Sequence, residues 1–406
     1  MSVTLIFALA GIILVLGFFA DYIFKKTGIP DILILILLGI EIGPVLKLID
    51  PNVLDPISPI FSALALILIL FDGGLNLDIK KVLRDSPRAI VLATLNIILS
   101  IILVGYFGKW ILGWSLLNGF LLGAIIGGTS SSIVLPLLQG IVADEKIEIT
   151  LSLESAFTDA LVVVLGITLI QYLMLPTQTG GLSVIIEDIT SAFSIAIVVG
   201  FVIGIIWLKF LRSVKIGRKM YNDIITLAIL LLFYSIVEQV GGNGAIFALM
   251  FGLVLGNGIR ISKVLGIRRG VEAGRFMRRF QAEVTFFIKT FFFVYLGLIF
   301  AVNSLITILY SLAIMILLLL GRYISVRISS FNEKILSSRK DLMLIMMPRG
   351  LSAAVLAQIV ITSGIMGTEL FPDIILLIII YSVLISSFGI FMIKRRKPQQ
   401  PVKPSK

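Results

Sequence analysis

The chain has 406 residues, of which 58% are hydrophobic and only 14% charged, and its mean hydropathy is +1.12. Water-soluble globular domains do not reach these values, so we interpret the chain as an integral membrane protein. The formal net charge of +11 does not indicate a nucleic-acid partner, because the apolar runs leave no sizeable soluble domain and a basic surplus in a membrane protein marks cytoplasmic loops. With no cysteine and no histidine, proton chemistry must fall on carboxylates, amines or water.

Long apolar segments recur along the whole sequence. A helix needs about 20 mainly apolar residues to cross about 30 Å of hydrocarbon. The sequence predicts thirteen such spans, and hence an all-α polytopic membrane protein. The first is taken as a retained span, because the N-terminus has no basic n-region and no cleavage site. The predicted spans are Thr4–Ala20, Ile32–Lys47, Ile57–Asn76, Ala89–Gly108, Trp114–Leu138, Thr150–Leu175, Ile189–Leu208, Tyr221–Val240, Gly244–Asn257, Glu283–Val302, Ser304–Val326, Asp341–Gly364 and Ile374–Ile393.

The distribution of basic residues predicts the topology. An odd number of spans places the two termini on opposite sides, and the run Lys394–Lys397 places the C-terminus in the cytoplasm and the N-terminus outside. With that topology, 29 of the 34 Lys and Arg residues are cytoplasmic, and only Lys47 and Lys109 lie outside. Residues 394–406 are predicted to be a basic, disordered cytoplasmic tail.

Three basic residues fall inside the predicted spans. Arg322 lies in the cytoplasmic half of its span, so we expect its side chain to snorkel to the headgroups. Lys289 and Arg349 lie deeper, about 9–12 Å inside their helices. Ionisable groups at such depth are costly, and they are usually paired or part of a transport path.

Asp159 is the acidic residue placed closest to the membrane midplane, about 13 Å from the cytoplasmic side. Ser155 lies one turn before it on the same helical face, and Glu154 shares an adjacent face with Thr158. A hydroxyl beside a carboxylate offers two hard oxygen ligands, which suit a dehydrated alkali cation or a proton. We therefore interpret Asp159 and Ser155 as a candidate ion site.

A purely structural role is the alternative for these acidic residues. Asp159 or Glu154 would then form a buried ion pair with Lys289 or Arg349. Asp72 ends the third predicted span near its cytoplasmic mouth, where a helix-terminal role and a functional role are both open.

Two predicted spans contain breaks. The fifth carries Gly127–Ser132 at its centre, followed by Pro136, and the twelfth carries Met347–Ser352. Such clusters free backbone groups, which is tolerated at membrane depth only where protein or water satisfies them. If the chain is divided into repeats at about 1–175 and 221–393, linked by the span 189–208, the breaks occupy equivalent positions. This arrangement is typical of a secondary transporter with two inverted six-helix repeats and crossed discontinuous helices.

At this point the sequence resembles the monovalent cation:proton antiporter (CPA) superfamily, and in particular archaeal and bacterial sodium/proton exchangers of the NhaP and NapA types. The resemblance covers essentially the whole chain. It is carried by the order and positions of several motifs, none specific alone: Phe71–Leu75, Gly127–Ser132, Glu154–Asp159, Gly241–Ala245, Gly252–Asn257, Phe286–Leu298 and Arg349-Gly350.

The resemblance implies a single transporter unit over residues 1–393, with a six-helix ion-binding core, a dimerisation bundle and hence a homodimer. Asp159 matches the aspartate that binds cation and proton in turn. Ser155 and Thr129 match positions that supply cation ligands, so the metal ligands for Na⁺ or K⁺ would be these three residues. Glu154 with Arg349 resembles a buried structural pair.

The sequence also departs from the family pattern. Thr158 stands where electroneutral exchangers usually carry Asn and electrogenic ones Asp, and Ser130 stands where the break often carries an aspartate. We include both as further oxygen donors of the predicted cation- and proton-binding site. Lys289 resembles the lysine of the electrogenic branch. Because no second acid stands at position 158, electroneutral one-for-one exchange is favoured, and a Lys289 that releases a proton on cation binding would reverse this.

The function that we expect is Na⁺/H⁺ antiport across the cell (plasma) membrane by alternating access, with no cofactor and no enzymatic activity. Its partners would be Na⁺ (or K⁺, Li⁺), H⁺ and membrane lipid. The nearest alternative is K⁺/H⁺ exchange, because the Thr and Ser oxygens of the break suit a larger ion. A remote alternative is an intramembrane aspartyl protease, which would need Asp72 and Asp159 to share a proton at close range.

Overall fold

The computed structural model describes residues 3–27, 29–49, 58–77, 87–139, 144–174, 182–213, 219–264, 275–300 and 304–396. These residues form helices joined by turns, and no strand occurs among them. The predicted tail therefore lies, from residue 397 onwards, outside the described residues. In chain order the helices are α1 (Val3–Thr27), α2 (Asp31–Ile40), the π-helical turn η1 (Glu41–Val45), α3 (Ser58–Asn76), α4 (Pro87–Ile111), α5 (Leu116–Ile125), α6 (Ser131–Gln139), α7 (Glu145–Met174), α8 (Leu182–Ser213), α9 (Lys219–Gln239), α10 (Gly244–Gly256), α11 (Gly258–Val264), α12 (Arg275–Leu298), α13 (Leu305–Ser329), α14 (Lys334–Ser338), α15 (Lys340–Ile345), α16 (Leu351–Ser363) and α17 (Phe371–Arg396).

Each predicted span coincides with one helix or with two helices in succession. Length and hydropathy identify six of the described helical segments as able to cross a membrane unaided: Ser58–Asn76, Pro87–Ile111, Glu145–Met174, Ile189–Leu211, Leu305–Ser329 and Phe371–Ile393. Four further apolar helices are shorter, among them α5, α10 and α16. The total of thirteen spans stays a prediction.

Helix ends follow local capping chemistry. The Ser115 side chain accepts a hydrogen bond from the backbone N–H of Asn118, and the Asn243 side chain accepts one from that of Ile246. Both contacts satisfy donors that the first turn of a helix leaves without an intrahelical partner. Gly364 ends α16 in the left-handed conformation, with φ of 62°, which glycine adopts without steric cost.

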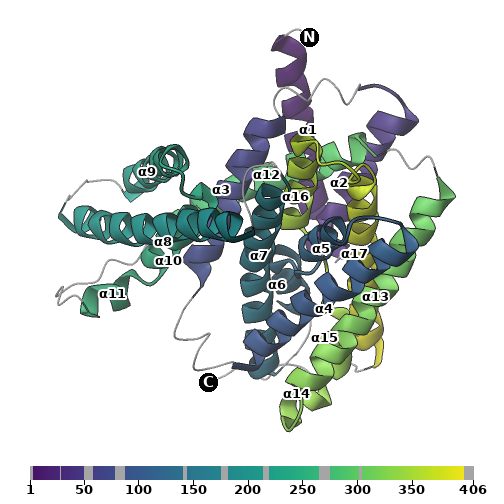
Figure 1. Ribbon diagram of the computed structural model, residues 1–406. Coiled ribbons are helices and arrows are strands. Elements are labelled where there is room, and N and C mark those ends of the chain that lie inside the picture. The colour runs from purple at the N-terminus through teal and green to yellow at the C-terminus, as the bar shows by residue number, and fades with distance from the viewer. Residues whose placement is uncertain are drawn as a thin grey trace.

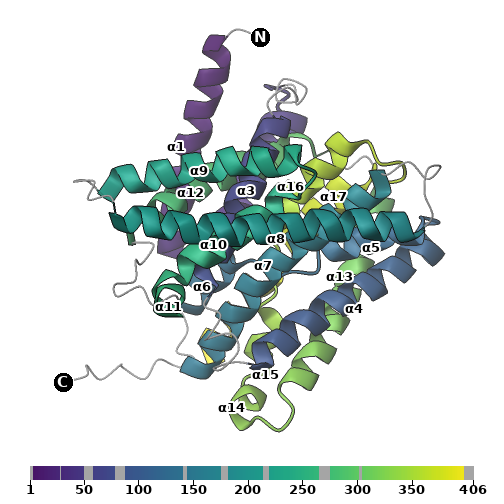
Figure 2. The same ribbon diagram turned by 60° about the vertical axis from the view of Figure 1, so that its left-hand side comes forward.

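The helices pack around α7 and α16, which lie near the centre of the molecule (Figure 1). On one side α10 packs against both α3 and α8, and on the other α13 packs against α4 and α17. The α3–α10 contact is a close backbone approach, because a Cβ atom on Gly74 would meet the backbone of α10 at Leu253 N, 2.7 Å away. Both views show α1 projecting beyond the other helices (Figures 1 and 2).

Both predicted breaks are present. Helix α5 ends at Ile125 and α6 begins at Ser131, while α15 ends at Ile345 and α16 begins at Leu351. Each pair is joined by a short non-helical segment whose residues are almost all buried. Buried backbone outside a helix must find other hydrogen-bond partners, and those partners define the candidate site.

Candidate functional site

The two broken helices contact each other directly at their breaks. The backbone N–H of Ser130 donates to the carbonyl of Pro348, with an N–O distance of 2.8 Å. Arg349 donates through Nη1 to the carbonyl of Gly128. Gly350 lies so close to Ser130 that an added Cβ atom would overlap the Ser130 hydroxyl. The crossing of the two breaks therefore requires a residue without a side chain at position 350.

Asp159 of α7 faces this crossing. Its Oδ2 accepts hydrogen bonds from the backbone N–H of Ser131 at 2.9 Å and from the Ser131 hydroxyl at 2.7 Å. Its Oδ1 accepts a third from the Ser352 hydroxyl at 3.0 Å. Ser131 is the first residue of α6 and Ser352 is the second residue of α16. One carboxylate thus lies at the N-terminal ends of both half-helices, where aligned peptide dipoles favour negative charge.

Lys289 does not pair with Asp159. It forms an ion pair with Asp31 of α2, and both side chains are largely buried, at 14% and 5% exposure. The predicted alternative of a Lys289 pair with Asp159 or Glu154 is therefore wrong. The reason is that α12 packs chiefly against α2, so its lysine meets the acid at the first residue of that helix.

Glu154 pairs with Arg322 of α13. Arg322 Nη1 donates to Glu154 Oε1 and Nη2 donates to Oε2 at 3.0 Å. The Arg322 side chain is fully buried, so the expectation that it snorkels to the headgroups is wrong. The expected pair of Glu154 with Arg349 is also corrected, since both carboxylate oxygens face Arg322 instead.

Arg322 also supports the second broken helix. Its Nε donates to the carbonyl of Met343 at 2.9 Å, and its Nη2 donates to that of Met346 at 2.8 Å. These carbonyls lie at the C-terminal end of α15, where the break removes their helical partners. A cation at the negative end of a helix dipole is stabilising, so Arg322 joins Glu154 to the end of α15.

Arg349 remains only partly satisfied. Its backbone N–H donates to the Ser382 hydroxyl at 2.9 Å, and one guanidinium nitrogen reaches Gly128. Its Nε and Nη2 atoms are buried and have no hydrogen-bond partner among the described residues. Arg349 therefore joins the second break to the Gly128 carbonyl of the first break, which follows α5.

The other predicted ion-site residues surround Thr129. The hydroxyls of Thr129 and Thr158 lie 3.1 Å apart, and Thr129 also donates to Glu154 Oε1 at 3.3 Å. The Ser155 hydroxyl donates to the carbonyl of Ser152 at 3.1 Å. Ser130 shares a hydrogen bond of 3.0 Å with the Ser132 hydroxyl. These oxygens are buried near the break, but none of them donates to Asp159.

Asp72 lies on α3, which packs against α7. It is partly buried near the end of α3 and accepts a hydrogen bond of 3.0 Å from the Asn76 side chain. The described hydrogen-bond donors to Asp159 are serines of the two breaks, whereas an aspartyl protease dyad would require a proton shared between two aspartates.

Two residues that contact Asp159, Ser131 and Ser352, are not among the predicted site residues, although both lie within the predicted breaks. Each closely follows a break, where the first turn of a helix begins. A hydroxyl at the restart of a broken helix is the signal that identifies them. Both serines donate to the Asp159 carboxylate, so the contacts of Asp159 at the crossing come from neutral groups.

The chain matches a family model described as the transmembrane sodium/hydrogen exchanger over residues 10–395. A relative, the K⁺/H⁺ antiporter NhaP2 of Shewanella sp. (strain ANA-3), is 26% identical over 412 residues, covering 99% of this chain and 69% of that protein. The same antiporter of Shewanella baltica (strain OS223) is 27% identical, and the match covers 65% of it.

Archaeal proteins also match. The probable Na⁺/H⁺ antiporter 2 of Methanocaldococcus jannaschii is 27% identical over 311 residues, which cover 73% of this chain and 70% of that protein. The structure of the sodium proton antiporter MjNhaP1 from the same organism superposes with a TM-score of 0.80 at 22% identity, covering 98% of this chain and 99% of that one. The last comparison shows that the two chains share a fold.

Proposed function

Because this chain belongs to the sodium/hydrogen exchanger family of transmembrane cation/proton antiporters, we propose that it exchanges Na⁺ for H⁺ across the cell membrane. Asp159 binds the two ions in turn. One carboxylate cannot hold a proton and a cation together, so the ions compete for it. Competition at a site that opens alternately to each side of the membrane produces exchange.

The observation that carries this proposal is the environment of Asp159. Its carboxylate accepts three hydrogen bonds from the two half-helix N-termini and forms no ion pair with a described basic residue. An arriving Na⁺ therefore displaces no resident side-chain cation. The hydroxyls of Ser131 and Ser352 lie beside the carboxylate and can turn their oxygens to the ion, joined by the oxygens expected from Ser155 and Thr129.

The buried charges support an electroneutral one-for-one exchange. Asp159 and Glu154 balance Arg322 and Arg349 when Asp159 is ionised, and either a proton or a monovalent cation on Asp159 adds the same single positive charge. Lys289 is neutralised by Asp31 and does not enter this balance. The exchange rate in proteoliposomes is therefore expected to be independent of an imposed membrane potential.

The assembly that we propose follows the sequence expectations. Thirteen spans place the N-terminus outside and the C-terminus in the cytoplasm, and two inverted repeats supply the crossed broken helices. A core bundle carries the ion site while a second bundle forms a homodimer within membrane lipid. The charge asymmetry of the loops and the two mutually contacting breaks support this arrangement.

The test is exchange by purified protein in proteoliposomes, followed by the dequenching of a pH-sensitive dye when Na⁺ is added. Asp159→Asn removes the carboxylate that accepts hydrogen bonds from Ser131 and Ser352 and should abolish the signal. Asp144→Asn is the matched control, because it removes an exposed carboxylate directly before the same helix. Exchange retained by Asp159→Asn would overturn the proposal.

K⁺/H⁺ exchange is the second candidate. Two observations favour it: the Shewanella relatives are named K⁺/H⁺ antiporters, and the hydroxyls near Asp159 are neutral oxygens of the kind that suits a larger ion. The same assay with Na⁺, Li⁺ and K⁺ separates the two candidates. A response to K⁺ alone would replace Na⁺ with K⁺ and leave the role of Asp159 unchanged.

A further inference from the structure

A buried polar contact joins α3 to α16 away from the ion site. Gln358 of α16 donates through Nε2 to the hydroxyl of Ser58, the first residue of α3. Gln358 is 2% exposed and Ser58 is 1% exposed. The Gln358 Oε1 atom is also buried and has no partner among the described residues. The contact thus holds two helices together while leaving one acceptor unsatisfied.

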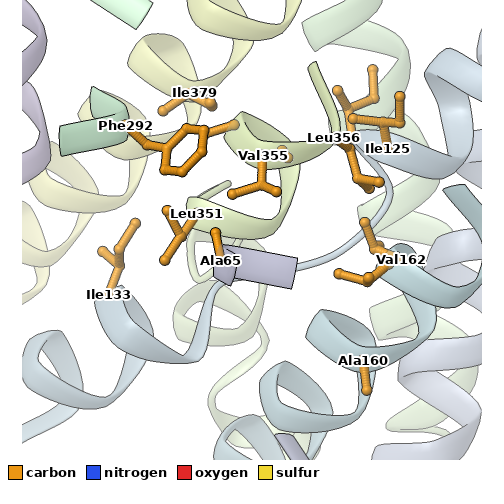
Figure 3. Close-up of a cluster of buried hydrophobic side chains, with 14 of the residues drawn as sticks. Ala65, Ile125, Ile133, Ala160, Val162, Phe292, Leu351, Val355, Leu356 and Ile379 are labelled. Carbon is orange, nitrogen blue, oxygen red and sulfur yellow. The ribbon is translucent and has the colours of Figure 1, made fainter. Parts of the chain in front are cut away.

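The position of this contact relates it to the ion path. Ser352, which donates to Asp159, precedes Gln358 by six residues, or about 9 Å along the helix. Leu351, seven residues before Gln358 and so on the same face of α16, lies close to Ala65 of α3 (Figure 3). In the topology proposed above, this end of α16 points to the outside of the cell. Gln358 and Ser58 therefore join α16 to α3 at a position on the outer side of Asp159.

The α3 side of the contact is built from small residues. Ser58, Ser62 and Ala65 lie at helical spacing and are all buried. The Ser62 hydroxyl donates to the carbonyl of Ser58 at 2.8 Å, within its own helix. The Gln358 side chain therefore bridges the two helices, whereas the Ser62 hydroxyl forms its hydrogen bond within α3.

We propose that the Ser58–Gln358 hydrogen bond is an outer gate of the antiport cycle, a role that rests on the proposed function. The bond stabilises the state in which α16 covers α3 and the path from Asp159 to the outside is closed. When α16 moves away from α3, water hydrates Ser58 and both ends of the Gln358 amide, including the acceptor that is unsatisfied in the closed state. The bond thus biases an equilibrium between two states rather than fixing one of them.

The test uses a single engineered cysteine, because the chain has none of its own. Ala65→Cys places a thiol on the covered face of α3, seven residues inward from Ser58. Its labelling by a membrane-impermeant maleimide is measured from the outside of intact cells. Adding Gln358→Leu or Ser58→Ala should speed labelling about 3- to 10-fold, the range expected for one lost hydrogen bond.

Two controls make the result specific. Ser62→Ala removes a hydroxyl from the same helix face without touching Gln358, and it should leave the labelling rate unchanged. The double variant Ser58→Ala with Gln358→Leu should label no faster than the single variants, because both remove one bond. Monodisperse elution of each variant in detergent shows that it is folded.

Unchanged labelling in folded Gln358→Leu protein, or equal acceleration by Ser62→Ala, overturns the gate. If Ala65→Cys itself does not elute as a folded species, a cysteine at Leu351 on the facing helix serves as the reporter with the same expected rates. The labelling experiment requires no transport, so its outcome is independent of the Asp159→Asn exchange assay. If labelling becomes faster but Asp159→Asn still exchanges ions, the gate is supported and the assignment of Asp159 as the ion site is contradicted.

Discussion

Replacing Glu154 by Gln is the sharpest test of how the core is held together. The Glu154 and Arg322 side chains are 1% and 0% exposed and meet through both carboxylate oxygens. Removing one member of such a buried pair leaves the other charge uncompensated, which typically costs about 3–5 kcal/mol. Glutamine keeps the shape of the side chain, so the loss should be about 3 kcal/mol.

A double-mutant cycle isolates the pair. The free energy of unfolding is measured in detergent by titration with sodium dodecyl sulfate, with the fluorescence of the three tryptophans as the signal. Glu154→Gln and Arg322→Met are compared singly and together. Because both single changes break the same contact, the double variant should lose less than their sum, with a coupling energy of about 2–3 kcal/mol.

The same cycle with Arg349→Met is the matched control. No hydrogen bond joins Arg349 to Glu154, since Arg349 donates to Gly128 instead. Its coupling energy with Glu154 should therefore be the smaller of the two. A larger coupling to Arg349 than to Arg322 would refute the assignment and restore the pairing expected from the sequence.

Three further outcomes follow from the geometry. Ser352→Ala should raise the apparent KM for the cation about 10-fold in the proteoliposome assay, since the carboxylate loses a charged hydrogen bond, whereas Ser155→Ala should change it less because that hydroxyl donates to a backbone carbonyl. Gly350→Ala should reduce the exchange rate and the thermal stability together, because its Cβ would overlap a serine of the other break. The hydrogen bond from Lys146 lowers the pKa of Glu333, so Glu333→Gln should lower the melting temperature at neutral pH, and this difference should vanish as pH falls through the lowered pKa.

Much of the helical architecture follows from the sequence. Apolar length predicts the six described helical segments that are long and apolar enough to cross a membrane, because a helical crossing requires about 20 apolar residues. The breaks at Gly127–Ser132 and Met347–Ser352 can also be predicted from the sequence, since clusters of glycine, proline and serine weaken a helix. Asp159 can be singled out from the sequence because a carboxylate deep in an apolar segment is energetically costly and usually has a functional or pairing role.

The partners of the charged residues do not follow from the sequence. Helical spacing states which residues share a face, but not which distant helix lies opposite. Arg322 and Glu154 are separated by 168 positions in the chain, and Lys289 and Asp31 by 258. The pairing of the acids with Lys289 rests on depth alone, and the pair of Glu154 with Arg349 rests also on the family resemblance. Neither depth nor resemblance determines which side chains meet in this chain.

A subtler signal in α13 predicts the burial of Arg322. Ser311, Arg322, Ser325 and Ser329 recur at helical spacing and are all buried. A lipid-facing helix surface would not carry such a polar stripe, because its hydroxyls would face hydrocarbon. The stripe places Arg322 on the inward side, where snorkelling is impossible and an internal acid is required.

The proposed exchange at Asp159 would depend on how the helix ends and the charged side chains are arranged around the two breaks. Arg349 bonds the Gly128 carbonyl in the break after α5, and Arg322 bonds the carbonyls at the C-terminal end of α15. Asp159 instead accepts hydrogen bonds at the N-terminal ends of α6 and α16. A helix N-terminus carries about half an elementary charge, spread over several N–H groups. Such partial charge stabilises the ionised carboxylate and remains in place when Na⁺ arrives, while a lysine in the same position would have to be displaced. If Asp159 is the exchange site proposed above, a basic residue at Ser352, which donates to that carboxylate, would compete with the ions. Ser352→Lys should therefore abolish the sodium-dependent dequenching signal in proteoliposomes, and a retained signal would contradict this reasoning.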